Sequence, residues 1–270
     1  MNRSVRVLAG LMIIAMMLMA AGCTKLQARD QLYKGVQSYK TARSEEAIQH
    51  FKRAVELDNK LLNARLYLAT AYAQQYIPGA DTEDNNRMAN SAIEEYKNVL
   101  QSDPNNVGSV KGIAYLYLQM KKFDQAKEYY KKAADIDPKD PETYYSVAVI
   151  DWTEAYQPRM EQRAKLGLKP TEALKDKKVC EALKEKNSAA VEDGIAMLNK
   201  ALQLRPDYDD AMAYMNLLYR ERADFNCDND ESKADLKTAD EWVDKTMATK
   251  KAKAEKAGQS GIVIDPNNKQ

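Results

Sequence analysis

Three prolines in this chain are spaced by one repeating length, and that spacing constrains the fold more than any other feature. Pro104, Pro138 and Pro206 each follow an apolar run and open a polar turn, as in Ser-Asp-Pro-Asn-Asn and Ile-Asp-Pro-Lys-Asp. The step from Pro138 to Pro206 is twice the step from Pro104 to Pro138. A fixed period of this size is typical of arrays in which each repeat packs on its neighbours. We therefore expect a stack of similar units.

Residues 107–140 show one unit most clearly. Apolar residues recur three and four positions apart in two runs, as on one face of an α-helix, and Pro138 closes the second run. These residues are Val110, Ile113, Ala114 and Tyr117 in the first run and Ala126, Tyr130 and Ala133 in the second. A 34-residue unit of two helices resembles the tetratricopeptide repeat family. The resemblance implies an all-α solenoid of antiparallel helix pairs.

The other units repeat the pattern with some erosion. Each has a small residue in its first helix, a small residue in its second helix, and then, four positions later, a large residue that we call the bulky position. The first-helix small residues are Gly35, Ala69, Ala114 and Ala148, and Asn216 departs from the pattern. The second-helix small residues are Ala47, Ala92, Ala126, Gly194 and Ala239, and the bulky positions are Phe51, Tyr96, Tyr130, Leu198 and Val243. The pattern predicts about five repeats over residues 28–256.

Insertions are expected between the two helices of three units, at about residues 77–90, 157–187 and 224–231. They occupy the same place in the repeat, so they should lie along one edge of the array. The length of the fourth unit also fits two degenerate repeats. One repeat with an insertion is favoured, because residues 158–168 lack the spacing from small residue to bulky position.

Residues 1–22 have the composition of an export signal. Arg3 and Arg6 precede an apolar run over residues 7–21 that is shorter than the roughly 20 residues of a membrane-spanning helix. The run ends in Ala-Ala-Gly-Cys, which resembles the bacterial lipobox, although Ala20 stands where leucine is usual. The resemblance implies cleavage after Gly22 and lipid attachment to the cysteine; an ordinary cleaved signal is the alternative.

This interpretation makes Cys23 the lipidated residue, residues 23–27 a short tether, and residues 257–270 a flexible tail. Thr24, by the same resemblance, suggests export to the periplasmic face of the outer membrane. Acyl chains hold a protein on a membrane by burying their methylene groups, each worth about 0.8 kcal/mol.

The charge balance and the scarcity of histidine argue against several functions. Lys and Arg number 41 and Asp and Glu 40, so no basic excess favours nucleic acid. The single histidine, His50, leaves few ways to build a zinc site or a histidine-based acid–base site. No phosphate-binding glycine loop or nucleophile elbow is present. We expect no enzymatic activity, cofactor or metal.

One polar stretch has the alternating oxygen spacing of a calcium loop. Its candidate ligands are Asp224, Asn226, Asp228, Asp230, Ser232 and Asp235. Asn229 in place of the turn glycine, and the interruption by Cys227, favour a polar turn in which Asp230 or Ser232 caps the next helix.

The family resemblance implies a concave groove lined by the first helices of the repeats. Its predicted wall is Leu32, Tyr33, Val36, Tyr39, Leu66, Tyr67, Lys111, Tyr115, Leu118, Tyr145, Val149, Trp152, Tyr214 and Leu217. Tyrosine-rich surfaces suit protein binding, although some of these residues are expected to pack on neighbouring helices instead.

The resulting hypothesis is a membrane-anchored scaffold of the bacterial cell envelope that binds a protein or peptide. Similar lipoproteins assist the assembly of outer-membrane, secretion or pilus complexes. The alternatives are a module that binds peptidoglycan or polysaccharide through Tyr and Trp152, and a structural lipoprotein that assembles through its insertions. The sequence leaves the oligomeric state open.

A disulfide between Cys180 and Cys227 is predicted for the exported protein. Both cysteines remain once Cys23 is assigned to lipid, and oxidising compartments allow disulfides to persist. Each lies in an insertion, and the two insertions belong to adjacent repeats. Two free thiols are the alternative.

Overall fold

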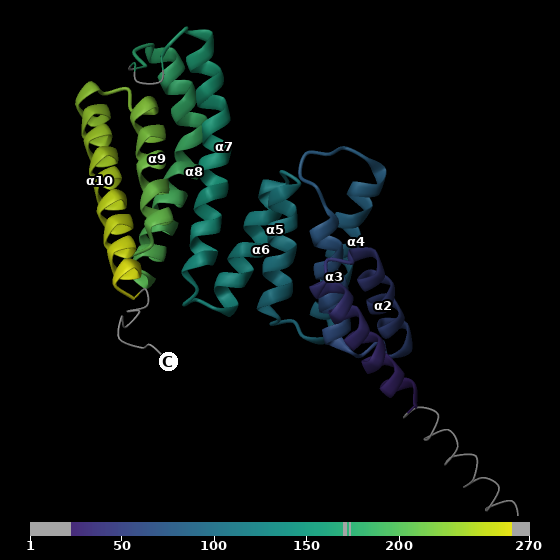
Figure 1. The fold of residues 1–270 in the computed structure, drawn as a ribbon. Helices are drawn as coiled ribbons and strands as arrows, with labels where there is room; N and C mark the ends of the chain where they lie inside the picture. Colours follow the sequence, from purple (N-terminus) through teal and green to yellow (C-terminus); the bar gives the residue numbers. More distant parts are fainter. Residues whose placement is uncertain (1–22, 170–171, 173, 261–270) are drawn as a thin grey trace, which may run out of the picture. The chain divides into compact units, whose positions relative to one another are not determined.

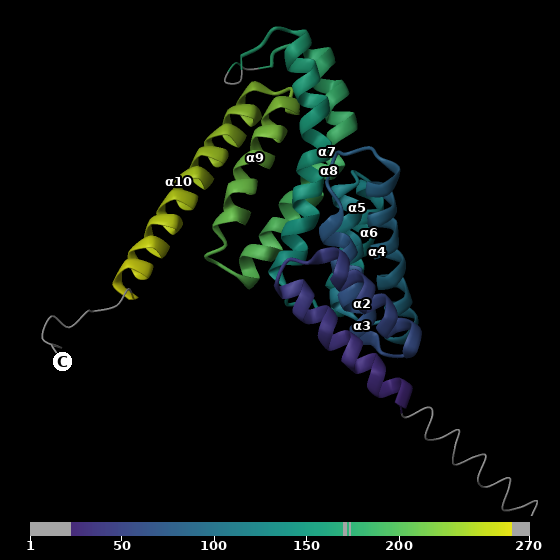
Figure 2. The same cartoon turned by 45° about the vertical axis from the view of Figure 1, so that its right-hand side comes forward.

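The computed structural model describes residues 23–169, 172 and 174–260, and their regular structure is entirely α-helical (Figures 1 and 2). Residues 23–40 form the first helix. The others are α2 (Ser44–Leu57), α3 (Leu62–Gln75), α4 (Glu83–Ser102), α5 (Val107–Gln119), α6 (Phe123–Ile136), α7 (Pro141–Lys165), α8 (Lys177–Leu204), α9 (Asp209–Phe225) and α10 (Asn229–Ser260). Consecutive helices form five pairs, as the sequence predicts.

The chain divides into two compact units, and the boundary falls between Tyr129 and Tyr130 within α6. In unit 1, which ends at Tyr129, α2 packs on α3, α3 on α4, and α4 on α5. A small residue allows close packing inside the first pair, because a Cβ built on Gly35 would lie 2.5 Å from the ring of Phe51. The small residue and the bulky position of one repeat therefore meet.

Unit 2, which begins at Tyr130, contains the longer helices α7 to α10, each packed on the next, with α7 also contacting α9. Its core joins Ala148, Ala155, Leu183, Val191, Ile195, Leu198, Ala201, Tyr208, Ala211, Met215, Leu218 and Phe225. Gly194 again gives close contact, since an added Cβ would lie 2.9 Å from Leu218 and 3.2 Å from Asp151.

The repeat pattern predicted this packing. All seven apolar residues named for the unit at 107–140 are buried, with exposed fractions from 0% to 8%. Pro104, Pro138 and Pro206 each lie two residues beyond the end of a helix, in the turn before the next repeat. The all-α solenoid of helix pairs is confirmed.

Most of the residues expected in insertions instead lengthen the paired helices. Residues 83–90 form the first two turns of α4, where Asn85 accepts a hydrogen bond from Ile77 N at 2.7 Å and donates to the carbonyls of Ile77 and Ala80 at 2.8 and 2.7 Å. The side chain of Asn85 thus satisfies the backbone of the short loop before it.

The fourth unit is a single long hairpin. Its first helix, α7, continues through Pro158 to Lys165, and its second, α8, begins at Lys177. Asp176 caps α8 by accepting hydrogen bonds from the backbone of Lys178 and Val179 at 3.0 and 3.1 Å. Residues 141–204 therefore do not fold as two short repeats.

Both ends of the described chain are helical. Residues 23–27, expected as a tether, form the first turn of a helix, and α10 extends to Ser260. The leader at 1–22 and the last part of the expected tail, 261–270, lie outside the described residues. Among the helices that the structure describes, none combines the length and apolar character needed to cross a bilayer.

Candidate functional site

All fourteen predicted groove residues keep some solvent exposure, as a binding surface requires. Tyr33, Tyr67 and Tyr115 are the most open, with 65%, 38% and 51% of their surface exposed. Nine of the fourteen, from Leu32 to Leu118, belong to unit 1, and five, from Tyr145 to Leu217, belong to unit 2. Each unit therefore carries its own candidate surface.

In unit 1 three predicted residues come together around a hollow of about 340 Å³. Tyr39 from the first helix and Leu66 and Tyr67 from α3 line it, together with Asn63 and Thr70. We call this cavity the unit 1 hollow. Its wall is mainly aromatic and aliphatic, and its polar groups are the Asn63 amide and the hydroxyls of Thr70 and the two tyrosines, so it suits an apolar or aromatic side chain with a polar neighbour.

The tyrosines that line this hollow pack against other aromatic rings. Tyr67 stacks on Phe51 with ring centres 5.4 Å apart and planes 20° apart, and it meets Tyr39 edge-on at 6.5 Å. Burial, with a further contribution from Tyr96, raises the pKa of Tyr39. The Tyr39 hydroxyl therefore stays protonated and able to donate a hydrogen bond.

In unit 2 the predicted residues pack largely on one another. Tyr214 of α9 meets Tyr145 and Trp152 of α7 edge-on, with ring centres 5.4 and 5.5 Å apart. All three rings also pack against the core of unit 2. Burial raises the pKa of Tyr145 and of Tyr214. For these residues packing between repeats accounts for much of the pattern that predicted a groove.

A polar network borders this aromatic cluster at the start of α7. Glu142 accepts hydrogen bonds from Tyr208 at 2.5 Å and from Arg205 at 2.6 Å. Burial alone would raise the pKa of Glu142, but these two donors outweigh it, so the pKa is lowered. The ionised carboxylate thus ties α7 to the turn before α9.

The structure also contains a buried charge cluster that the sequence analysis missed. Arg159 Nε lies 2.8 Å from Glu221 Oε2, and both Arg159 and Arg163 contact Asp224, at 3.1 and 2.7 Å. Arg163 and Glu221 are 3% and 1% exposed. Two arginines four residues apart in α7, opposite two acids three residues apart in α9, are a same-face spacing that could have revealed the cluster.

Two of the six candidate calcium ligands are paired with arginines instead. Asp224 pairs with the two arginines of α7, and Asp235 accepts hydrogen bonds from Arg222 at 3.0 and 2.6 Å. The cap of α10 is Asp228, rather than Asp230 or Ser232, because its side chain accepts hydrogen bonds from the backbone amides of residues 230 and 231. Within the described chain no group of three potential metal ligands converges.

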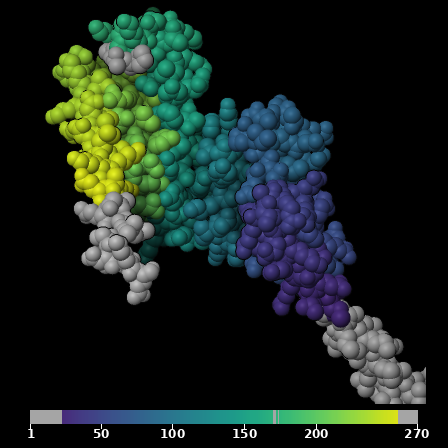
Figure 3. Space-filling view, viewed as in Figure 1, coloured from purple at the N-terminus to yellow at the C-terminus, as the bar shows by residue number. Residues whose placement is uncertain are grey.

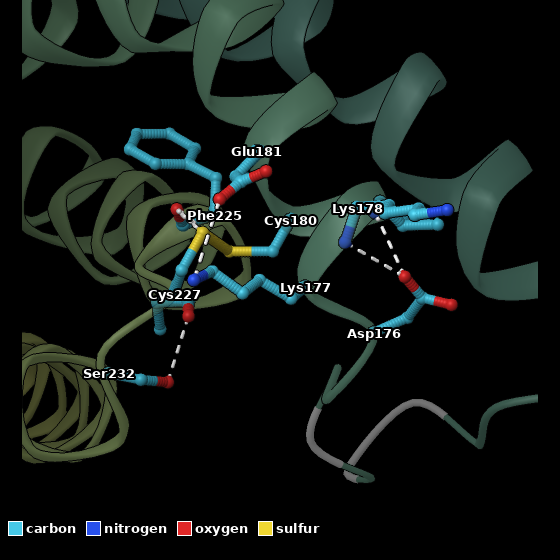
Figure 4. The surroundings of a disulfide bond; sticks show 10 residues. Asp176, Lys177, Lys178, Cys180, Glu181, Phe225, Cys227 and Ser232 are labelled. Atoms are coloured by element: carbon cyan, nitrogen blue, oxygen red, sulfur yellow. Dashed lines mark hydrogen bonds and ion pairs between the residues drawn. A yellow bond between two sulfur atoms is a disulfide. The ribbon is translucent and has the colours of Figure 1, made fainter.

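Cys180 and Cys227 form a disulfide, with their Cα atoms 5.7 Å apart. Figure 4 shows that it joins the first turn of α8 to the short connection between α9 and α10. Cys180 is 2% exposed, whereas Cys227 is open to solvent. The predicted pairing holds, and the bond lies at the loop end of two neighbouring helix pairs.

The single histidine and the cysteine proposed for lipid attachment both lie on the first two described helices. His50 Nδ1 lies 2.8 Å from Gln31 Oε1, on the contact between the first two helices, and its Nε2 lies 3.7 Å from Glu46. Cys23 is exposed and is the free cysteine of the described residues. It lies at the first position of the helix 23–40.

Comparison with known proteins agrees with the fold. Residues 86–149 match the tetratricopeptide repeat family, and no curated protein matches the chain. A crystal structure of MamA has a TM-score of 0.56 and 13% identity over 89% of this chain and 98% of that one. MamA from Desulfovibrio magneticus RS-1 has a TM-score of 0.56 and 16% identity, with 84% and 96% covered.

A third structure is YrrB, described as a tetratricopeptide repeat protein with an unusual peptide-binding site. It has a TM-score of 0.50 and 12% identity, covering 83% of this chain and 90% of that one. At these identities the likeness shows a shared fold.

Proposed function

From this tetratricopeptide-repeat architecture we propose that the protein is a non-catalytic scaffold that binds a segment of a partner protein. The observation that carries the proposal is the unit 1 hollow, where Tyr39, Leu66 and Tyr67 converge from two helices yet remain open to solvent. Rigid aromatic side chains offer large contact area at low entropic cost. A scaffold needs such a surface and no reactive group.

The chemistry of the hollow defines the segment it would take. An apolar or aromatic side chain fits the ring faces, while Asn63 and the Thr70 hydroxyl border the cavity. Thr70 donates to the Leu66 carbonyl at 2.8 Å and lies 3.2 Å from the Tyr96 hydroxyl. The peptide-binding site described for YrrB supports a protein ligand rather than a small molecule.

We place this activity in the bacterial cell envelope, with the protein held by lipid on Cys23 at the periplasmic face of the outer membrane. The leader pattern and the exposed Cys23 support the anchor. A disulfide fits an oxidising compartment. The role that follows is in assembling outer-membrane, secretion or pilus complexes.

Site-specific photo-crosslinking tests the binding surface. A photoreactive residue at Asn63, which is exposed and lines the hollow, should capture a partner from envelope extract, whereas one at exposed Gln101 of α4 should not. Asn63→Arg should fill the hollow and weaken binding of the captured partner at least about ten-fold, with Gln101→Arg as the matched control. Equal capture at positions 63 and 101 would contradict the proposal. Loss of capture after glycan digestion would favour the glycan-binding alternative.

A further inference from the structure

A regular contact joins each repeat of unit 1 to the next. It involves the residue two places before the first-helix small residue, which we call the junction position. At junction position 67, Tyr67 stacks on Phe51, the bulky position of the preceding repeat. At junction position 112 there is a glycine, and a Cβ added there would lie 2.7 Å from Tyr96, again the preceding bulky position. Each junction residue thus covers the bulky residue of the repeat before it.

In the first described helix, the junction residue has no bulky residue of a preceding described repeat to cover. Tyr33 is the first junction residue, one repeat period before Tyr67. It is 65% exposed, compared with 38% for Tyr67. Leu26, two helical turns earlier, is 71% exposed. The helix 23–40 is the first of the described chain, so none of the described repeats precedes it.

In the last repeat, the residue at the bulky position is exposed. The bulky positions Phe51, Tyr96, Tyr130 and Leu198 are 0%, 7%, 5% and 0% exposed, whereas Val243, the last of them, is 38% exposed. Met247, one turn further along α10, is 65% exposed. Terminal repeats of soluble arrays normally carry polar outer faces. Here both ends carry exposed apolar residues at the positions used for packing between repeats. Figure 3 shows the first described helix in purple and α10 in yellow, each with part of its surface open.

The two ends differ in their local charge. The helix 23–40 has the basic residues Lys25, Arg29, Lys34 and Lys40 and the acidic residue Asp30. Residues 229–247 of α10 have the acidic residues Asp230, Glu231, Asp235, Asp240, Glu241 and Asp244 and the basic residues Lys233, Lys237 and Lys245. Asp235 and Asp240 pair with arginines of α9, and the rest of α10 carries Lys250, Lys251, Lys253 and Lys256, so charge contributes little to the proposed contact. Such charges set orientation and association rate more than affinity.

We propose that the protein associates with further copies of itself head to tail, with the Tyr33 face of one copy covering the Val243 face of the next. Both halves of the repeat junction are present in one chain, so a second copy supplies the matching surface. The contact is heterologous, because the two faces differ, and it adds copies without using up the ends. It uses neither the unit 1 hollow nor the connections between paired helices.

Sedimentation velocity on the chain from residue 23, with Cys23→Ser and the disulfide intact, tests this directly. The sedimentation coefficient should rise steadily between low and high micromolar protein. Tyr33→Glu and Val243→Glu should each weaken self-association at least about ten-fold. A mixture of the two variants should form a 1:1 dimer, because each retains the face that the other lacks. Tyr115→Glu, at an exposed tyrosine elsewhere in unit 1, is the matched control and should associate normally.

Several results would overturn the proposal. A protein that stays monomeric throughout has no such contact. A mixture of the two variants that stays monomeric would place the contact elsewhere. So would a Tyr115→Glu variant that also loses self-association.

Circular dichroism checks that each variant is folded, and Leu26→Glu with Met247→Glu provides a second pair of variants on the same two faces. Loss of vesicle binding in Tyr33→Glu, with self-association unchanged, would assign this face to a membrane.

Discussion

At the scale of single residues, Glu221 is an acid buried beside both a positive and a negative charge. It is 1% exposed and lies beside Arg159, while Asp224 adds a second negative charge nearby. Burial raises the pKa of Glu221 to about 7, against the attraction of Arg159. Because a carboxyl group in the unfolded chain titrates near 4.5, the folded protein binds the proton more tightly over this interval. Stability therefore falls as pH rises from about 4.5 to about 7.

Glu221→Gln should remove this dependence, because glutamine resembles the protonated acid and does not titrate. The free energy of unfolding of the wild type, relative to the variant, should fall by up to roughly 3 kcal/mol between pH 4.5 and 7.5. Urea unfolding of both proteins at the two pH values measures this difference. A difference that is the same at both pH values would mean that Glu221 titrates normally.

Gly35 illustrates a second residue-scale constraint, the space left for a side chain. Gly35→Ala places a methyl group 2.5 Å from the buried Phe51 ring, and overpacking of this kind costs about 1–3 kcal/mol. Gly108→Ala is the control, because its Cβ would meet only Asn106, at 3.6 Å. Thermal unfolding should show a lower Tm for the first variant and an unchanged or higher Tm for the second. Equal shifts would show that the Phe51 contact is loose.

At the scale of elements, three helices end in the same way. Ala42, Lys121 and Gly167 have positive φ angles of 56°, 56° and 66°. The residue after each donates a backbone hydrogen bond to a carbonyl five residues earlier, at 2.9 to 3.0 Å. This is the Schellman arrangement, which favours glycine because a side chain is strained at positive φ. One of the three ends has glycine and two do not.

Lys121→Gly should therefore stabilise the protein, since relief of strain exceeds the entropy that glycine adds to the unfolded chain. We expect a gain of about 0.5–1 kcal/mol in the free energy of unfolding. Lys122→Gly, one residue later, should lose stability. Chemical denaturation of both variants checks the pair, and a loss in both would contradict the assignment of strain to residue 121.

The disulfide is a covalent link between elements, joining α8 to the connection between α9 and α10. It closes a loop of 47 residues that contains most of α8 and all of α9. Replacing Cys180 and Cys227 with serine should lower the free energy of unfolding by about 3–4 kcal/mol in the chain-entropy model. Denaturation of the double variant, beside the wild type with and without reductant, measures this. Equal stability in all three would show that the loop is already ordered by packing.

At the scale of the whole molecule, the period of the prolines and the small residues was enough to predict the helix pairs and their core. Gly35 and Tyr130 lie as expected because repeat packing depends on local, regular spacing. The charge cluster around Arg159 was missed because the sequence shows the same-face spacing within α7 and within α9 but does not show that these two helices face each other. Trp152 and Tyr214 could not be divided between groove and packing, since both environments favour aromatic residues.

The location of the molecule is a further prediction at this scale. Cys23→Ser should move the protein from the membrane fraction to the soluble fraction, because the acyl chains of the proposed anchor could not attach. Fractionation after a high-salt wash is the measurement, since salt screens peripheral electrostatic binding but leaves acyl burial intact. A substituted protein that remains on the membrane would contradict lipid anchoring at this residue.

The unequal exposure of the two bridged cysteines has a kinetic consequence. Thiol–disulfide exchange requires an attacking thiolate to reach one sulfur while the other leaves. Cys227 is the accessible residue, so a reductant attacks there and Cys180 must depart. Reduction should therefore pass through an intermediate in which the reductant is joined to Cys227 and Cys180 is released.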